Sequence, residues 1–534
     1  MKAVIRARSS PRAWTAALTA LASTISATLL LRAAESATGQ AAVEPVVYTV
    51  RFPAPGTHSA HVEARFPTDG RGAVELMMPV WTPGYYRVED YASEVREFAA
   101  RTAEGAILEV TQPRTNRWRI HGATGSQIVV TYRLRCEGRS VTRNWVGPDF
   151  AVLNGASAFP MLTGTTPRAY EVQLELPPGW EQSITALPAA PGSTHRYHAA
   201  DYDTLVDSPI LAGRLGIHEF DVAGSRHVLA DAGELGSWDG ARAAQELERL
   251  VRTHHRFWGQ LPFQRYVFLN LFRQGGGGLE HRNSTLLTAS PRASAAPTRS
   301  WLAFVSHEYF HAINVKRLRP VEFDSFDYEN PARTRSLWVS EGLTTYYGEV
   351  LTTRAGIGTP QDLLRWISSE IRRLQTQPGR LAQTLEQASL EVWNTPTSGL
   401  ARNAPTNTVS YYVKGPIVGF LLDAKIQRST GGRKSLDDVM RLACARYSGE
   451  HGFTPEQFQS TAEEVAGLDL RDWFRRALAS TEELDYAEAL EWFGLQFGSA
   501  DRAESRWNLE ARPDVTAEQT ARWRRLAGFD ERTE

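Results

Sequence analysis

The chain has 534 residues, which at about 150 residues per domain allows two to four domains. Hydrophobic residues make up 42% and charged residues 22%, the balance of a globular protein with sizeable cores. The 59 basic and 60 acidic residues leave a net charge of −1, which argues against nucleic-acid binding, a polybasic membrane-surface protein and a disordered acidic tail. Two cysteines exclude a disulfide scaffold and a cysteine-rich metal module.

The beginning of the chain has the layout of a secretory signal peptide. Basic side chains up to Arg12 are followed by an uncharged run over residues 13–31 and then by small residues. This run is rich in Ala, Thr and Ser, which makes it a poor permanent membrane span, although an uncleaved N-terminal anchor stays open. We expect residues 1–41 to be a signal peptide and the protein to be periplasmic or secreted, with no membrane contact once the signal is cleaved.

The next part of the chain shows short β patterns between turn signals. Residues 46–52, 128–132 and 170–174 are rich in β-branched and aromatic side chains, and Pro-Gly pairs separate such segments. Long helical periodicity is missing from this part. The sequence therefore predicts an all-β sandwich domain over residues 42–215.

After residue 215 a few strand patterns give way to helical ones. Strands are predicted at 217–222, 227–230, 266–272 and 284–288, with a helix at about 241–257. Apolar residues at three/four spacing then predict helices at 299–315, 336–354, 361–374, 410–427, 436–447 and 456–465, and short helical patches at 485–493 and 517–526. We expect a domain of a small sheet plus helices over residues 216–430 and a helical C-terminal region over residues 431–534.

The strongest chemical signal is the segment His307-Glu308-Tyr309-Phe310-His311. Two histidines four positions apart lie on one face of a helix, one turn apart, so both imidazoles can bind one tetrahedral zinc ion. Glu308 lies beside that face, where its carboxylate can take a proton from the attacking water. The alternative is a helix with surface His and Glu, but the segment also carries an apolar stripe that would bury the helix.

A catalytic zinc ion needs a third protein ligand and an open position. Asn314 and Arg317 stand where a metzincin would have Gly and His, which excludes that class. The other common solution is a glutamate from a following helix, and Glu341 is far enough along the chain for such a helix to return to the metal. Otherwise Glu341 is an ordinary helix-face carboxylate. Glu349 either lies on a solvated face or orients a ligand histidine.

A run of four glycines, Gly275 to Gly278, precedes Leu279-Glu280-His281. No Lys-Ser/Thr pair follows the glycines, which argues against a phosphate-binding loop. They join one predicted strand to the strand at 284–288, whose edge can bind an extended peptide as an added strand. Glu280 at such an edge is a candidate for binding a substrate ammonium group, and the alternative is a structural turn.

Four separated segments carry a family resemblance. They are residues 79–86 (PVWTPGYY), 277–285 (GGLEHRNST), 307–320 (HEYFHAINVKRLRP) and 337–347 (LWVSEGLTTYY). Together they resemble the glycyl aminopeptidase family of zinc metallopeptidases, gluzincins with a thermolysin-like catalytic domain and an N-terminal β domain. The resemblance covers roughly residues 45–480.

The resemblance implies a role for each matching residue: His307, His311 and Glu341 as zinc ligands, Glu308 as general base, and Glu280, with Gly277 and Gly278 beside it, in binding the free amino terminus of the substrate. Tyr411–Gly415 is similar to a Tyr-x-Lys-Gly segment whose tyrosine stabilises the oxyanion. That tyrosine corresponds to Tyr412, although Tyr411 is adjacent and the choice stays open.

The sequence departs from the family pattern at three places. Leu279 stands where we expect Met and Ile313 where we expect Trp, and both changes should alter the shape of the pocket and not the metal chemistry. Many relatives carry a C-terminal PDZ domain, and the residues after 480 are too few and too helical for one.

The sequence therefore predicts an α+β multidomain protein: a β-sandwich, a zincin catalytic domain and a helical C-terminal part. Its predicted function is that of a zinc aminopeptidase that releases small N-terminal residues, Gly or Ala, from peptides. One alternative is a thermolysin-like endopeptidase, which would share the metal site but would not need Glu280. The other is a non-catalytic peptide-binding protein. Peptides are the expected partners, and the oligomeric state is left open.

Overall fold

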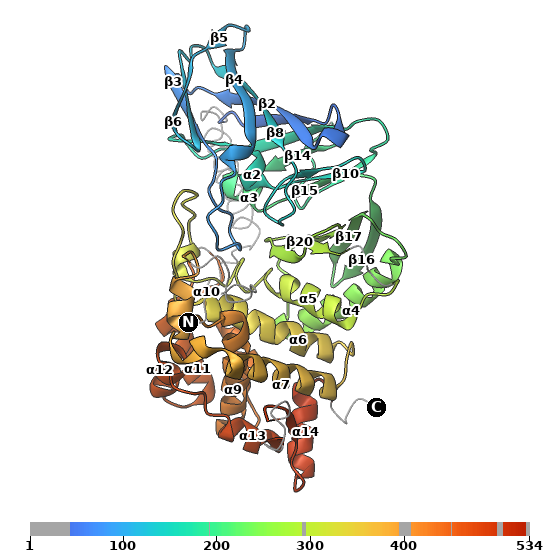
Figure 1. The fold of residues 1–534 in the computed structure, drawn as a ribbon, viewed down its shortest axis with the longest axis vertical. Coiled ribbons are helices and arrows are strands. Elements are labelled where there is room, and N and C mark those ends of the chain that lie inside the picture. Colours follow the sequence, from blue (N-terminus) through green and yellow to red (C-terminus); the bar gives the residue numbers. More distant parts are fainter. Residues whose placement is uncertain are drawn as a thin grey trace, which may run out of the picture. The chain divides into compact units, whose positions relative to one another are not determined.

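A computed structural model describes residues 43–191, 193–290, 295–394, 407–449, 451–498 and 506–529 (Figure 1). The predicted signal peptide, residues 1–41, lies outside these residues. Within them, no helix combines the length and the apolar character that crossing a membrane requires.

The N-terminal part of the described chain consists of β-sheets (Figure 1). One sheet has the order β14-β12-β1-β2-β8-β4-β5, with β1 (Val46–Arg51), β2 (Ser59–Pro67), β4 (Val95–Thr102), β5 (Ile107–Leu108), β8 (Gln127–Arg135), β12 (Tyr170–Glu175) and β14 (Arg196–Ala199). A second has the order β11-β3-β7-β6, with β3 (Ala73–Met77), β6 (Val110–Arg114), β7 (Arg117–His121) and β11 (Met161–Leu162). A third has the order β13-β15-β10-β9, with β9 (Trp145–Val146), β10 (Phe150–Leu153), β13 (Gln182–Ile184) and β15 (Ile210–Gly213). The short helices are η1 (Pro55–Thr57), η2 (Ala92–Glu94), α2 (Gly155–Ala158) and α3 (Tyr202–Val206).

The alternating pattern along β1 explains how these sheets enclose a core. Val46, Tyr48 and Val50 are buried, whereas the residues between them are partly exposed, because successive side chains of a strand point to opposite faces. β1 pairs with β2 in antiparallel and with β12 in parallel orientation. The buried side chains of the first two sheets meet in one apolar cluster. The predicted β domain is confirmed.

The third sheet joins the β domain to the next part of the chain, because both of its faces are buried. Along β10, Ala151 and Leu153 belong to the core of the β domain. Phe150 and Val152 point to the other face, where they share a cluster with strands of the following sheet. This apolar interface lies inside one compact unit, residues 45–534, so it holds segments of the β domain against the part of the chain that carries the histidines.

The following sheet has the order β16-β17-β18-β20-β19, with β16 (Gly216–Val222), β17 (Ser225–Gly233), β18 (Arg265–Phe272), β19 (Gly277–Glu280) and β20 (Ser284–Ala289). Helices α4 (Gly240–Trp258) and α5 (Arg299–Phe310) pack against one face of it. The glycine-rich segment differs from expectation, because part of it is itself a strand: β19 pairs with β20 in antiparallel orientation and forms an edge of the sheet. Gly277, Gly278 and Glu280 therefore lie on an edge strand.

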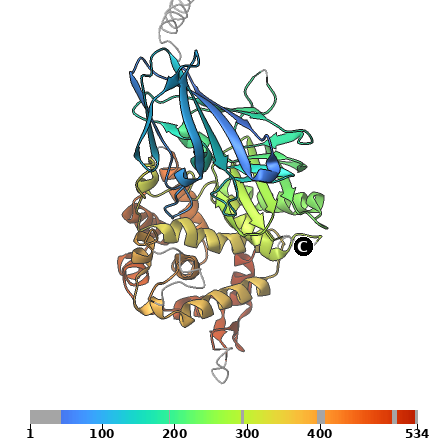
Figure 2. The ribbon, with the colours of Figure 1, turned by 45° about the horizontal axis from the view of Figure 1, so that its top comes forward.

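The remainder of the described chain is mostly helical and contains one two-stranded sheet, β21-β22 (Figures 1 and 2). Its elements are η3 (Val321–Phe323), the π-helix η4 (Trp338–Leu343), α6 (Thr344–Arg354), α7 (Pro360–Thr376), η5 (Pro378–Leu381), α8 (Leu385–Leu390), α9 (Tyr411–Ser429), α10 (Leu436–Tyr447), α11 (Pro455–Ala466), α12 (Arg471–Ala479), α13 (Ala487–Phe493), β21 (Leu495–Phe497), β22 (Leu509–Ala511) and α14 (Ala517–Leu526). Helix α9 is largely buried and contacts α6, α7, α8, α10, α11 and α13 around it. One apolar core therefore contains helices from both sides of residue 430. Together with the β domain that precedes it, this helical part confirms the predicted α+β multidomain fold.

Candidate metal centre and active site

Helix α5 carries the two histidines at its C-terminal end. It begins where the Oγ1 of Thr298 accepts a hydrogen bond from the backbone N–H of Trp301 at 3.2 Å. It ends at Phe310, five residues earlier than the apolar pattern predicts, so His311 occupies the C-cap position. The backbone turns here, and the Nδ1 of His311 donates to the carbonyl oxygen of Asn314 at 2.8 Å. The early end of the helix thus supplies the acceptor that orients this imidazole.

Glu341 lies in the middle of the π-helix, where the sequence pattern predicts a regular α-helix. Two threonine hydroxyls bond carbonyls in this widened turn: Thr344 donates to Ser340 at 2.6 Å and Thr345 donates to Glu341 at 2.8 Å. The side-chain amide of Asn314 donates to the carbonyl of Val339 at 2.8 Å. Single π-turns inside helices are frequent at functional sites, and this one aims Glu341 at the end of α5.

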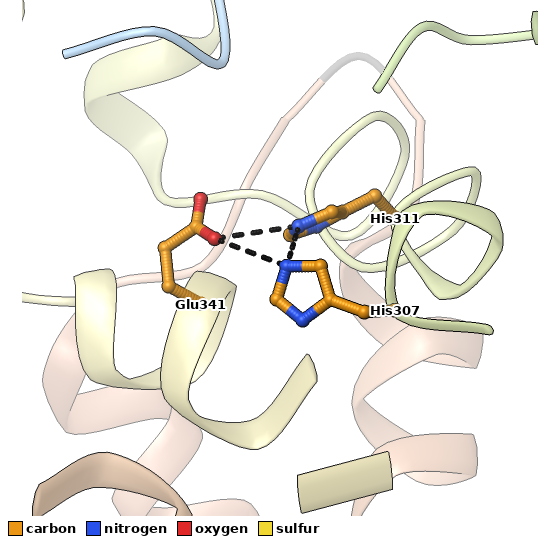
Figure 3. Close-up of side chains that lie close together, drawn as sticks. All are labelled: His307, His311 and Glu341. Carbon is orange, nitrogen blue, oxygen red and sulfur yellow. Dashed lines mark hydrogen bonds and ion pairs between the residues drawn. The ribbon is translucent and has the colours of Figure 1, made fainter. Parts of the chain in front are cut away.

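The ligand atoms of His307, His311 and Glu341 converge on one point (Figure 3). The Nε2 atoms of the histidines are 3.0 Å apart, and the Oε2 of Glu341 is 3.7 Å from the Nε2 of His307 and 3.3 Å from that of His311. A zinc ion bound to such atoms at about 2.0–2.1 Å would place them about 3.3 Å apart at the corners of a tetrahedron. The donor set and its spacing fit a zinc ion.

Each imidazole is held through its other nitrogen. The Nδ1 of His307 lies 3.3 Å from the hydroxyl of Thr345, whose own proton goes to the carbonyl of Glu341. The hydroxyl therefore accepts from His307, just as the Asn314 carbonyl accepts from His311. In a neutral imidazole this leaves the Nε2 atom free to bind a metal, which is the arrangement found around metal-ligating histidines.

Two more carboxylates are buried beside this point. Glu280 is 4% and Glu308 5% exposed, and each has an oxygen within 4.8 Å of a ring nitrogen of His311. The Nδ1 of His311 is already hydrogen-bonded, so this residue has one nitrogen left and can bind only one metal ion. With His307 and Glu341 it forms a site of two histidines and one glutamate, which is a common type of catalytic zinc site. Burial raises the pKa of Glu308 to about 8 and raises that of Glu280 as well. This concentration of buried acidic groups is what a bound cation would offset.

In the described part of the chain, the carboxylate of Glu280 forms no ion pair. Among the described residues, none donates a hydrogen bond to its Oε1. Lys316 is near enough to influence Glu280 electrostatically, but its ammonium group donates to Asp207 at 2.9 Å. A buried carboxylate oxygen without a partner is costly, and a substrate ammonium group is a ligand that would satisfy it.

Gly278 determines where the carboxylate of Glu308 lies. A Cβ atom added to Gly278 would lie 2.8 Å from the Cγ of Glu308 and closer still to its carboxylate. The edge strand and the candidate base can be this close only because residue 278 has no side chain. Next to Gly277, by contrast, a Cβ would meet no atom within 4 Å.

We expect the Gly278→Ala variant to lose about 10²-fold in kcat, because a displacement of about 1 Å in a catalytic group has an effect of that size. Its metal content should be unchanged, since the ligands lie on other elements. Hydrolysis rates and metal content of purified Gly278→Ala and Gly276→Ala provide the check, because a Cβ at Gly276 meets nothing within 4 Å. Equal activity of the two variants would show that Gly278 has no part in placing Glu308.

The structure distinguishes the two adjacent tyrosines at the start of α9. The ring of Tyr412 is partly exposed and lies beside that of His307, with centroids 6.2 Å apart. Tyr411 is only 1% exposed and belongs to the apolar core. Helix α9 comes this near because Gly342 and Gly415 face each other, and a Cβ on Gly342 would lie 2.7 Å from the Cα of Gly415. Tyr412 is the tyrosine that faces the histidines.

The β domain contributes contacts that the sequence did not indicate. The hydroxyl of Tyr86 donates to the Oε1 of Glu341 at 2.9 Å. Gly84, which has a φ of +97°, lies against Glu280: a Cβ on Gly84 would be 2.7 Å from the Cδ of that glutamate. Both residues belong to the PVWTPGYY segment, so the only signal for them was the family resemblance of that segment.

Glu349 has neither of the roles considered for it. Its carboxylate accepts a hydrogen bond from Arg299 at 2.6 Å in a largely buried ion pair. Glu349 thus ties α6 to the start of α5, away from the histidines.

Comparisons with known proteins give the family and the fold. The family model of the peptidase M61 N-terminal domain matches residues 47–214, and that of the M61 glycyl aminopeptidase matches residues 300–418. The chain is similar to an aminopeptidase N family protein from Idiomarina loihiensis, with 28% identity and a TM-score of 0.80 over 84% of this chain and 78% of that one. An M1 zinc metallopeptidase from Deinococcus radiodurans has 12% identity and a TM-score of 0.53 over 83% of this chain and 95% of that one, a likeness of fold alone. No curated protein matches this chain.

Fold, site and comparisons together define a metallopeptidase. The two matched domains cover more than half of the chain, and the chain belongs to the M61 glycyl aminopeptidase family.

Proposed function

We propose that this protein is a zinc-dependent aminopeptidase that removes small N-terminal residues from peptides. His307, His311 and Glu341 would hold the zinc ion, since their free ligand atoms converge at suitable distances. The ion would supply a Lewis acid that polarises the scissile carbonyl and lowers the pKa of a water molecule. The predicted signal peptide supports export of the enzyme, with peptides as its partners.

The chain's own groups would carry out the remaining steps. Glu308, held by the edge strand, takes a proton from the attacking water and returns it to the amine that leaves. Tyr412, beside His307, donates to the oxygen on which negative charge develops. Glu280 pairs with the substrate ammonium group and so places the first peptide bond next to Glu308.

The observation that carries the aminopeptidase assignment is the position of Glu280. Its carboxylate has one oxygen without a hydrogen-bond partner among the described residues and offers a ligand atom within 4.8 Å of those of Glu308 and His311. The backbone of Gly84 lies directly against the same carboxylate. We infer that this contact would stop a peptide chain from continuing past Glu280, so that the bound substrate would begin here. An endopeptidase would need an open cleft on this side.

The pocket beside Glu280 supports a preference for small first residues. It is lined by large rings of the β domain and of the segment after α5, namely Trp81, Tyr86, Phe323 and Phe326. The space that these rings enclose is small, about 20 Å³, which would leave little room for a long side chain of the first residue. Glycine and alanine are the residues that we propose.

The test is hydrolysis of glycyl- and alanyl-4-nitroanilide by the purified protein. We expect release of 4-nitroaniline that a chelator abolishes and added zinc restores. Absence of release from protein that holds stoichiometric zinc would contradict the aminopeptidase assignment. N-acetylated peptides would then be tested as endopeptidase substrates.

Glu280→Gln separates an aminopeptidase from an endopeptidase. We expect this variant to lose about 10²-fold in kcat/KM on a free peptide, because truncating one partner of a buried charge pair costs several kcal/mol. Cleavage of the N-acetylated peptide, slow in the parent protein, should not change. The exposed Glu234 provides the control variant Glu234→Gln. Equal losses on the free and the acetylated peptide would show that Glu280 does not bind the amine.

A further inference from the structure

We propose that Tyr86, which the β domain supplies, is a positioning residue of the metal site: its hydroxyl holds one oxygen of Glu341 so that the other faces the histidines. The proposal rests on the metal site of the proposed function. It assigns the β domain a direct part in that site.

The first argument is that the two carboxylate oxygens of Glu341 have different neighbours. The Oε1 accepts the hydrogen bond from Tyr86 at 2.9 Å, whereas the Oε2 lies 3.3 Å from the Nε2 of His311 and 3.7 Å from that of His307. The side chain of Glu341 is 2% exposed, so water has little access to its carboxylate. Without Tyr86 the Oε1 would be a buried acceptor without a described donor, and rotation of the carboxylate would become easier.

The second argument is that Tyr86 is itself held in place from several sides. Its ring stacks on Phe323, with centroids 6.2 Å apart and planes at 21°, and meets the edge of Trp393 at 6.1 Å. Packing on two faces restricts the ring to one orientation. The hydroxyl is therefore aimed at Glu341 before any metal binds.

The third argument is that residues 79–86, which include Tyr86, are attached by hydrogen bonds to the part of the chain that follows α5. The indole N–H of Trp81 donates to the carbonyl oxygen of Asp327 at 2.8 Å, and the backbone N–H of Val80 donates to the carbonyl oxygen of Tyr328 at 2.9 Å. These bonds join residues about 250 positions apart in sequence, and they fix the segment beside the π-helix. The fold thus brings a donor to the metal ligand from a separate domain.

The experiment compares Tyr86→Phe with Tyr85→Phe. Phenylalanine keeps the ring packing and removes only the hydroxyl, and Tyr85 is the matched control because it packs instead against the core between the β domain and the catalytic sheet. We expect zinc to transfer to excess chelator about 10- to 100-fold faster from Tyr86→Phe than from the parent protein, the usual effect of removing a partner of a metal ligand. Tyr85→Phe should match the parent protein.

Two further readouts keep the result independent of folding and of the assigned activity. The rise in Tm on adding zinc is measured against the metal-free form of each variant, and it should be smaller for Tyr86→Phe. The visible absorption of the cobalt(II)-substituted protein reports ligand geometry and should shift in this variant alone.

Unchanged zinc transfer and an unchanged cobalt spectrum in Tyr86→Phe would overturn the proposal. If kcat alone falls while zinc is retained as in the parent protein, Tyr86 contacts the reacting group directly and the positioning role is also wrong. Neither result bears on the proposed function, which depends on hydrolysis by the parent protein.

Discussion

The Glu308→Gln variant is expected to retain zinc and to hydrolyse alanyl-4-nitroanilide about 10³-fold more slowly than the parent protein, within the range that general acid–base catalysis contributes. Glutamine occupies nearly the same volume between α5 and Gly278, but it cannot take a proton from the attacking water. The loss should appear in kcat, since Glu308 does not bind the substrate ammonium group. Steady-state kinetics and the zinc content of the purified variant check both parts.

Glu349→Gln is the matched control for this variant. Glu349 is also a largely buried glutamate, but its partner is Arg299 and not a site residue. We expect it to lower stability modestly and to leave kcat near that of the parent protein. Near-normal turnover by Glu308→Gln would exclude Glu308 as the base.

Replacing His311 by Ala is expected to yield a protein without stoichiometric zinc and with at least about 10³-fold less activity. A catalytic metal contributes several kcal/mol of charge stabilisation, and about 1.4 kcal/mol corresponds to a factor of ten in rate. The Nε2 of His311 lies closest to the other donors, 3.0 Å from His307 and 3.3 Å from Glu341. Its loss leaves two donors, too few for a catalytic zinc site.

Metal analysis and activity of His311→Ala should be measured beside His451→Ala, which removes an exposed histidine. Circular dichroism of the metal-free proteins shows whether the His311 variant is folded. If His311→Ala binds zinc with the affinity of the parent protein, the ligand assignment is wrong. The same result would exclude the alternative set of Glu280, Glu308 and His311, because both sets contain His311.

Local patterns predicted most of the long helices, but in the β domain they placed only β1, β8 and β12. Helix α14 begins and ends where the apolar spacing placed it, and β1, β12 and β18 lie within one residue of the predicted strands. Such patterns succeed because one buried face of a helix or strand imposes its own period on the sequence. They failed at the end of α5 and in the π-helix, because there the backbone is set by side-chain bonds of Asn314 and Thr344 and not by an apolar face.

The sequence by itself determined the fold class, the family and the residues that converge on the metal site, because His307 and His311 are one helical turn apart and Glu341 lies in a motif of its own. Only the tertiary structure showed that the ring of Tyr412 lies beside that of His307, and it alone revealed the contact of Tyr86 with Glu341 and of Gly84 with Glu280. The physical reason is distance along the chain. Tyr86 and Glu341 are separated by 255 positions. A local sequence pattern reports only which residues of one helix or strand share a face, so it cannot predict a contact between side chains of two domains.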